Sequence, residues 1–135
     1  MSRVRCLKLI ALLFVGYVPH LHAQRIRQVR VVQASAELFR FEPTRVKAHP
    51  GDVLEFTVVS GGPYVIGFEP KDLSEADRAL LDHAIPGRTA LLRGPVLTGK
   101  DSRLRITLPA LAKGAYRFVS VTHLAYRMGG VLVIE

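Results

Sequence analysis

The chain alternates apolar and polar residues in several short segments, each bounded by glycine, proline or aspartate. This period of two is typical of β-strands that bury one face. The alternating or wholly apolar segments are residues 27–35, 39–46, 53–59, 64–68, 103–108, 116–120 and 131–134. Seven or so short strands separated by turns predict an all-β fold, specifically a β-sandwich.

Local signals refine this prediction. Residues 27–35 alternate basic and apolar side chains, so we expect an edge strand there. Pro43 restricts its segment to a sheet edge or a bend, because proline donates no ladder hydrogen bond. Ser74 opens a capping motif that predicts one short helix ending near Ile85. Residues 88–100 contain Gly94-Pro95 and Gly99 and are predicted to form a loop.

The first 23 residues have the layout of a secretory signal peptide. Residues 1–8 carry three basic side chains and no acid, residues 9–18 are an apolar run, and Leu21-His22-Ala23 offers a small-residue cleavage site. The alternative is a membrane anchor, but a spanning helix needs roughly 20 apolar residues. We expect export to the periplasm or beyond after cleavage near Ala23, leaving residues 24–135 as one domain.

Composition limits the partners and the metal ligands that the expected mature domain can have. Residues 24–135 contain 16 Lys and Arg against 11 Asp and Glu, a formal charge of +5, which favours acidic partners. The basic residues are scattered, which argues against nucleic acid as a partner. Cys6 is the only cysteine and lies in the predicted signal segment, so the expected mature domain has no disulfide and no thiolate for a metal.

Two motifs have the spacing of a known metal-binding frame. Ser120-x2-His123-x4-Met128 precedes Gly129-Gly130 and a closing apolar strand, and Pro63-Tyr64 opens the strand after a glycine-rich loop. This arrangement resembles the plastocyanin-like cupredoxins, the blue copper proteins, whose motifs are Cys-x2-His-x4-Met and Pro-His. The resemblance covers about residues 36–135. It implies a Greek-key β-sandwich with one short inserted helix.

By this resemblance, the four copper-ligand positions are Tyr64, Ser120, His123 and Met128. A blue copper centre needs two imidazoles, one thiolate and a long axial thioether. Tyr64 and Ser120 replace one imidazole and the thiolate, so two of the four ligands are substituted. We expect Tyr64 to cover the former pocket and to hydrogen-bond Ser120 or His123, His123 to be a surface residue, and Met128 to fill the core.

Other residues near these positions bear on the function. Arg127 stands where the resemblance would place glycine, and its charge would disfavour a metal cation. His49 and His83 are expected to be solvated and to form no replacement ligand set. The pair of Ser120 and His123 could suggest a hydrolase, but no residue is placed to orient the histidine, and no oxyanion donors are evident. We therefore expect no enzyme activity.

The sequence leaves two functions open. The first is an exported binding or scaffold module that kept the cupredoxin frame without copper, with Leu124, Tyr126 and Arg127 as a docking face for an acidic or redox protein partner. The second is copper binding and electron transfer through a non-standard site. The sequence identifies neither the partner nor the oligomeric state.

Overall fold

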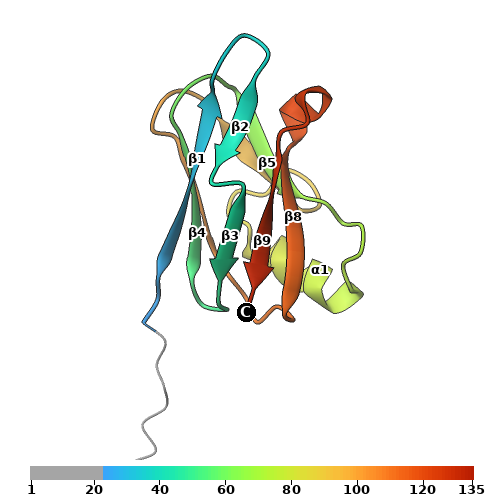
Figure 1. The fold of residues 1–135 in the computed structure, drawn as a ribbon. Coiled ribbons are helices and arrows are strands. Elements are labelled where there is room, and N and C mark those ends of the chain that lie inside the picture. Colours follow the sequence, from blue (N-terminus) through green and yellow to red (C-terminus); the bar gives the residue numbers. More distant parts are fainter. Residues whose placement is uncertain (1–22) are drawn as a thin grey trace, which may run out of the picture.

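The computed structural model describes residues 23–135, which form two β-sheets packed face to face (Figure 1). The first sheet has the strand order β2-β1-β4-β7 and the second has the order β3-β9-β8-β5-β6. The first sheet contains β1 (Ile26–Gln33), β2 (Phe39–Glu42), β4 (Val53–Val58) and β7 (Arg103–Thr107). The second contains β3 (Arg45–Ala48), β5 (Tyr64–Phe68), β6 (Arg93–Leu97), β8 (Gly114–Ser120) and β9 (Gly129–Ile134). The predicted all-β Greek-key sandwich is confirmed.

Two helical segments lie near opposite ends of the sandwich in Figure 1. The helix α1 (Glu75–Ala84) follows β5, and the short 3-10 helix η1 (Val121–Tyr126) joins β8 to β9. The Ser74 hydroxyl accepts the Asp77 backbone N–H at 3.0 Å, which confirms the predicted helix start. No helix within residues 23–135 is long and apolar enough to cross a membrane.

The core lies between the sheets and is filled by the inward side chains that the alternation predicts. Phe41 from β2, Phe56 from β4 and Phe118 from β8 meet edge to face, with ring centroids 4.9 to 5.7 Å apart. Each such aromatic pair stabilises the fold by about 0.5–1.5 kcal/mol beyond the area it buries. This cluster joins the two sheets.

Three local predictions have different outcomes. The strand at residues 27–35 was predicted to lie at an edge, but β1 pairs with both β2 and β4, so that prediction is wrong. The prediction of a loop at residues 88–100 is wrong in part, because this segment contains the strand β6. Pro95 does not prevent that strand, since proline is tolerated at a sheet edge. Pro43 does mark a bend, since it separates β2 of one sheet from β3 of the other. Residues 1–22, which hold most of the predicted signal peptide, lie outside the described part of the chain.

Candidate functional site at the η1 end of the sandwich

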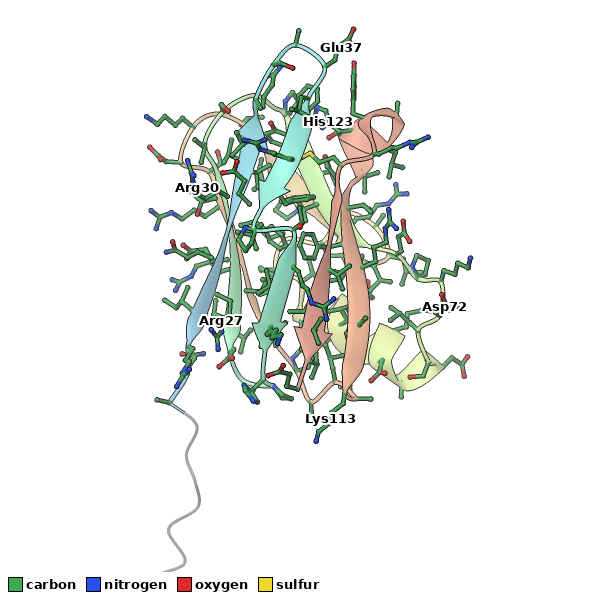
Figure 2. All side chains as sticks on the ribbon, in the orientation of Figure 1. Arg27, Arg30, Glu37, Asp72, Lys113 and His123 are labelled. Atoms are coloured by element: carbon green, nitrogen blue, oxygen red, sulfur yellow. The ribbon has the colours of Figure 1, made fainter. Side chains whose placement is uncertain are left out.

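The four predicted ligand positions come from segments that meet at the η1 end of the sandwich, where Figure 2 labels His123. Tyr64 is the first residue of β5, and Ser120 is the last residue of β8. His123 lies within η1, and Met128 directly precedes β9. The Ser120 N–H donates to the Met128 carbonyl at 3.1 Å, which fixes the two ends of the connecting loop together.

Ser120 and His123 are in direct contact. The Ser120 Oγ lies 3.0 Å from Nδ1 of His123, and the Thr122 Oγ1 lies 2.9 Å from the same nitrogen. The Thr122 Oγ1 also lies 3.2 Å from the Pro63 carbonyl and 3.2 Å from the Ser120 Oγ, so the imidazole nitrogen belongs to a small network of hydroxyls. This network satisfies Nδ1 within the protein.

His123 is buried, contrary to the prediction that it is a surface residue. Its side chain is packed among aromatic rings, with centroid distances of 4.2 Å to Phe39, 4.9 Å to Tyr64 and 6.1 Å to Tyr126. Only 9% of the residue is exposed. Burial lowers the pKa of His123 below its usual value, because the charged imidazolium loses hydration. The imidazole is therefore held in its neutral form.

Tyr64 is fully buried, but its hydroxyl does not reach the predicted partners. It donates instead to the Ser60 carbonyl at 2.7 Å, so the prediction of a bond to Ser120 or His123 is wrong. The glycine-rich loop curls over the phenol, and Gly61 passes so close that a side chain there would overlap the Tyr64 hydroxyl. Burial raises the pKa of Tyr64, which keeps the phenol protonated.

The remaining predicted residues divide between core and surface. Met128 is 2% exposed and belongs to the hydrophobic core, as predicted. Leu124, Tyr126 and Arg127 are all exposed at the same end of the molecule. His83 is exposed and His49 is half-buried, and neither belongs to this cluster.

Comparison with known proteins identifies the fold. A mutant plastocyanin of a fern superposes with a TM-score of 0.64 and 22% identity, over 81% of this chain and 100% of that chain. The oxidized plastocyanin of Dryopteris crassirhizoma gives 0.64 and 21% over the same shares. A reduced Cu(I) form of a mutant amicyanin gives 0.57 and 18%, over 84% of this chain and 85% of that one. No family model and no curated protein matches the sequence.

The chain has a cupredoxin fold. At these low identities the likeness extends to the fold, and the chemistry of the site depends on the residues in this chain. Within residues 23–135, no three His, Cys, Asp or Glu side chains gather to hold a metal ion.

The residues at the four positions do not fit a blue copper ion in this cupredoxin fold. The Ser120 oxygen is a hydroxyl in contact with the His123 Nδ1, and it cannot replace a thiolate near neutral pH. The protonated Tyr64 phenol is directed at the Ser60 carbonyl and stands in place of an imidazole. The His123 imidazole and the Met128 thioether are the two ligand types that remain of those the centre requires.

The Ser120 and His123 pair does not form a catalytic dyad either. Ser120 has no exposed surface, so its hydroxyl cannot reach a substrate. The pair is better described as a buried polar contact that fixes η1 on the end of β8.

Sequence reasoning missed two members of this cluster. Phe39 was assigned only to a strand, but its ring lies against His123 from the other sheet. Thr122 was not among the predicted site residues, yet its hydroxyl links His123 to Pro63. No local pattern indicates either contact. A threonine directly before the histidine was the one available signal.

Proposed function

We propose that this protein is an exported, copper-free binding module built on the cupredoxin fold. The single observation that carries the proposal is the contact of the Ser120 hydroxyl with Nδ1 of the buried His123. At the position inferred for a thiolate, the chain has a small polar side chain that satisfies a buried histidine. The former ligand residues then stabilise the loop end instead of binding a metal.

The proposed working surface is the docking face formed by Leu124, Tyr126 and Arg127. Leu124 is 54% exposed and Tyr126 is 47% exposed, so two large side chains of the short helix η1 lie together at the surface. The Tyr126 ring rests on Phe39 at 4.8 Å, so the exposed aromatic is held on a rigid base. Tyrosine and arginine are enriched in protein interfaces. The charge of +5 on residues 24–135 favours an acidic protein partner.

Metal analysis tests the copper-free state. Residues 24–135 should be exported in copper-supplemented cells, purified without chelator, and analysed for copper by mass spectrometry. We expect far less than one copper per chain. After loading with Cu(II), we expect no intense thiolate-to-copper absorption, because no cysteine follows Cys6. Stoichiometric copper in the exported protein would contradict the proposal.

One observation favours a second function, copper binding and electron transfer through a non-standard site. The bond from Ser120 to the Met128 carbonyl holds the methionine segment at the same end of the sandwich as His123. An imidazole and a thioether together are suitable donors for Cu(I). This function would require His123 to release its contacts with Ser120 and Thr122. Stoichiometric, colourless copper that is lost in His123→Phe would support it.

A further inference from the structure

A row of paired residues crosses four strands on the outer face of the second sheet. Gly129 of β9 pairs with Val119 of β8, Val119 pairs with Gly67 of β5, and Gly67 pairs with Arg93 of β6. Val119 and Arg93 line one surface pocket, and Gly129 lines another, so this row connects two pockets.

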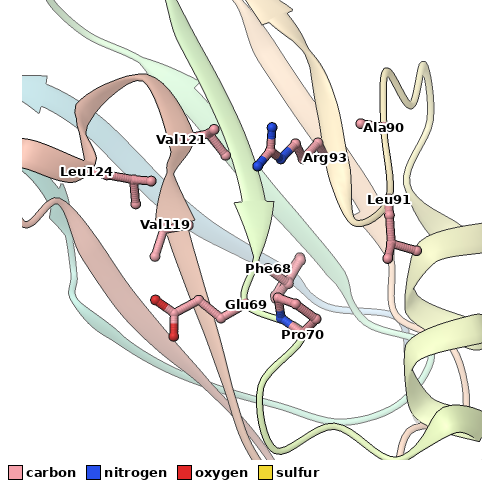
Figure 3. Close-up of a pocket in the computed structure, with 9 residues that line it drawn as sticks. All are labelled: Phe68, Glu69, Pro70, Ala90, Leu91, Arg93, Val119, Val121 and Leu124. Carbon is pink, nitrogen blue, oxygen red and sulfur yellow. The ribbon is translucent and has the colours of Figure 1, made fainter.

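The first of these pockets is an apolar groove of about 360 Å³ (Figure 3). Its walls include Leu91 before β6, Val119 of β8, and Val121 and Leu124 of η1. Leu91 is 55% exposed and Leu124 is 54% exposed. Figure 3 shows Val119, Val121 and Leu124 on one side of β5 and Leu91 on the other. Exposed leucines on both sides of a groove indicate a surface that is completed by a ligand.

The second is an arginine pocket of about 270 Å³, whose lining includes Arg45, Arg117 and Arg127. Arg45 of β3 and Arg117 of β8 flank Val131 of β9 in one cross-strand row, so both side chains point outward on the same face. A Cβ at Gly129 would lie 3.5 Å from a terminal nitrogen of Arg117, so the guanidinium group packs over this glycine. Three cations from different elements thus share one pocket.

Nearby carboxylates neutralise these three cations only in part. The Arg117 Nε lies 3.3 Å from the Glu69 carboxylate, but the Arg45 and Arg127 guanidinium groups make no hydrogen bond or ion pair with any residue in 23–135. Three guanidinium groups and one carboxylate leave two positive charges in excess. Such a cluster repels itself, and an incoming carboxylate relieves the repulsion while accepting paired N–H bonds.

We propose that this face binds an acidic segment of a protein partner, with an Asp or Glu carboxylate in the arginine pocket and an apolar side chain in the apolar groove. This inference rests on the proposed docking function and names the chemistry of the partner. Leu124 and Arg127 of the docking face line the groove and the pocket respectively, which makes the two surfaces continuous.

The geometry of the sheet sets the spacing of the two contacts. Gly129 lines the arginine pocket, and Val119 and Arg93, one and three strands away, line the apolar groove. The groove is therefore centred about two strands from Gly129, a separation of about 10 Å at the usual strand spacing. About three extended residues span that distance. The acidic and apolar residues of the partner are therefore about three positions apart. The groove is open, and the leucines in its walls are about half exposed. A long alkyl chain would therefore stay partly exposed to water, so it fits less well than one apolar side chain.

The test is a titration of 15N-labelled residues 24–135 with the capped peptide Gly-Asp-Gly-Gly-Leu-Gly, followed by backbone amide shifts. We expect the shifts to concentrate at Gly67, Val119, Gly129 and Val131. Replacing Asp by Asn in the peptide should weaken binding about fivefold, as should replacing Leu by Gly. Shifts spread over the whole surface, or an Asn peptide that binds equally well, would overturn the proposal.

A matched pair of variants separates the pocket from general charge. Arg45→Gln and Lys47→Gln each remove one cation from an outward position of β3, but only Arg45 lines the pocket. Arg45→Gln should weaken the Asp peptide about threefold, and Lys47→Gln should leave its affinity unchanged. Equal losses of peptide affinity in both variants would show that only the net charge matters, which would overturn the proposed site.

Two further ligands test the nature of the occupant. Inorganic phosphate that binds the arginine pocket as tightly as the peptide would overturn a protein segment as the ligand, as would dodecanoate that binds more tightly. Failure of the peptide is distinguishable from failure of the proposed function. The copper-free state rests on metal analysis, and the docking role can still be measured at Tyr126, which lines neither the groove nor the pocket.

Discussion

The Ser120 Oγ and the His123 Nδ1 lie 3.0 Å apart in the interior of the η1 end, with Thr122 as their shared neighbour. This contact satisfies a buried imidazole without a metal ion. It also fixes the first turn of η1 on the end of β8, so the docking face is presented on an ordered base. Four predictions test this arrangement and the surface next to it.

The first prediction concerns pH. Burial places the folded-state pKa of His123 below its ordinary value of 6.5, so the unfolded chain takes up the proton first as the pH falls. The free energy of unfolding should therefore be fully retained above pH 6.5 and should decline as the pH falls from 6.5 through the folded-state pKa. Among residues 23–135, no charged side chain contacts the imidazole, which is faced by Phe39, Tyr64 and Tyr126.

Urea unfolding of the wild type and of His123→Phe between pH 5 and 8 measures this effect. The variant lacks the titrating group, so its stability should fall less over that range. It should also be less stable at pH 8, because the Ser120 and Thr122 hydroxyls lose a hydrogen-bond partner. Parallel pH profiles for the two proteins would show that His123 does not titrate with folding.

The second prediction tests the cover over Tyr64. Gly61 has φ +78°, and a Cβ there would lie 2.5 Å from the Tyr64 hydroxyl and 2.7 Å from the Gln33 side chain. Gly99 has a similar φ of +83° but open space around it. Gly99→Ala should cost about 1 kcal/mol from backbone strain. Gly61→Ala should cost a further roughly 1–3 kcal/mol from the overlap.

Thermal or denaturant unfolding of both glycine variants gives the comparison. If Gly61→Ala is no more costly than Gly99→Ala, the loop is not packed on the phenol as described. A Gly61→Ala/Tyr64→Phe double variant measures the coupling between the two residues, since removal of the hydroxyl should recover part of the stability lost in Gly61→Ala.

The third prediction is that the ligands can be restored. Ser120→Cys supplies a thiolate next to His123, and Tyr64→His supplies a second imidazole from β5. Neither change completes the set, so the double variant should gain much more copper affinity than the two single variants together. Tyr64→His leaves a void and loses the bond to Ser60, at a cost of about 1–3 kcal/mol.

Absorption spectroscopy after Cu(II) loading measures the outcome, with an intense thiolate-to-copper band expected only in the double variant. Arg127→Gly is the control for residual repulsion by the cation. Arg127 has φ 55°, a left-handed conformation that glycine adopts without strain, so this change should not harm the fold. A folded triple variant that takes up no copper at a blue site would show that the four positions are assigned wrongly.

The fourth prediction concerns Arg127 as a contact residue. Arg127→Glu should weaken binding of the acidic-apolar peptide and reduce the salt dependence of that binding, because it reverses one charge of the pocket. The free energy of unfolding should change by less than about 0.5 kcal/mol, as for most exposed substitutions. Peptide titrations at two salt concentrations and a thermal melt provide the measurements. A large loss of stability would instead make Arg127 a structural residue.

The sequence determined the parts of the fold that depend on near neighbours. Alternation located the inward side chains of most strands, and Ser74 marked the start of α1 because a cap depends on residues three apart. The same local signals failed at Pro95, where the sequence indicates a loop. A proline is compatible with β6 only because that strand lies at a sheet edge, and edge position is a property of the whole sheet.

The sequence by itself also determined that no thiol follows Cys6, and hence that residues 24–135 contain no thiolate for a blue copper ion. Only the tertiary structure decided what the remaining residues do. His123 is buried because Phe39, from the opposite sheet, closes over it. The apolar groove and the arginine pocket lie next to each other because strand pairing places Val119, which lines the groove, between Gly67 and Gly129, the second of which lines the pocket. Contacts between residues so distant in the chain depend on strand register across the sheets, which local periodicity does not specify.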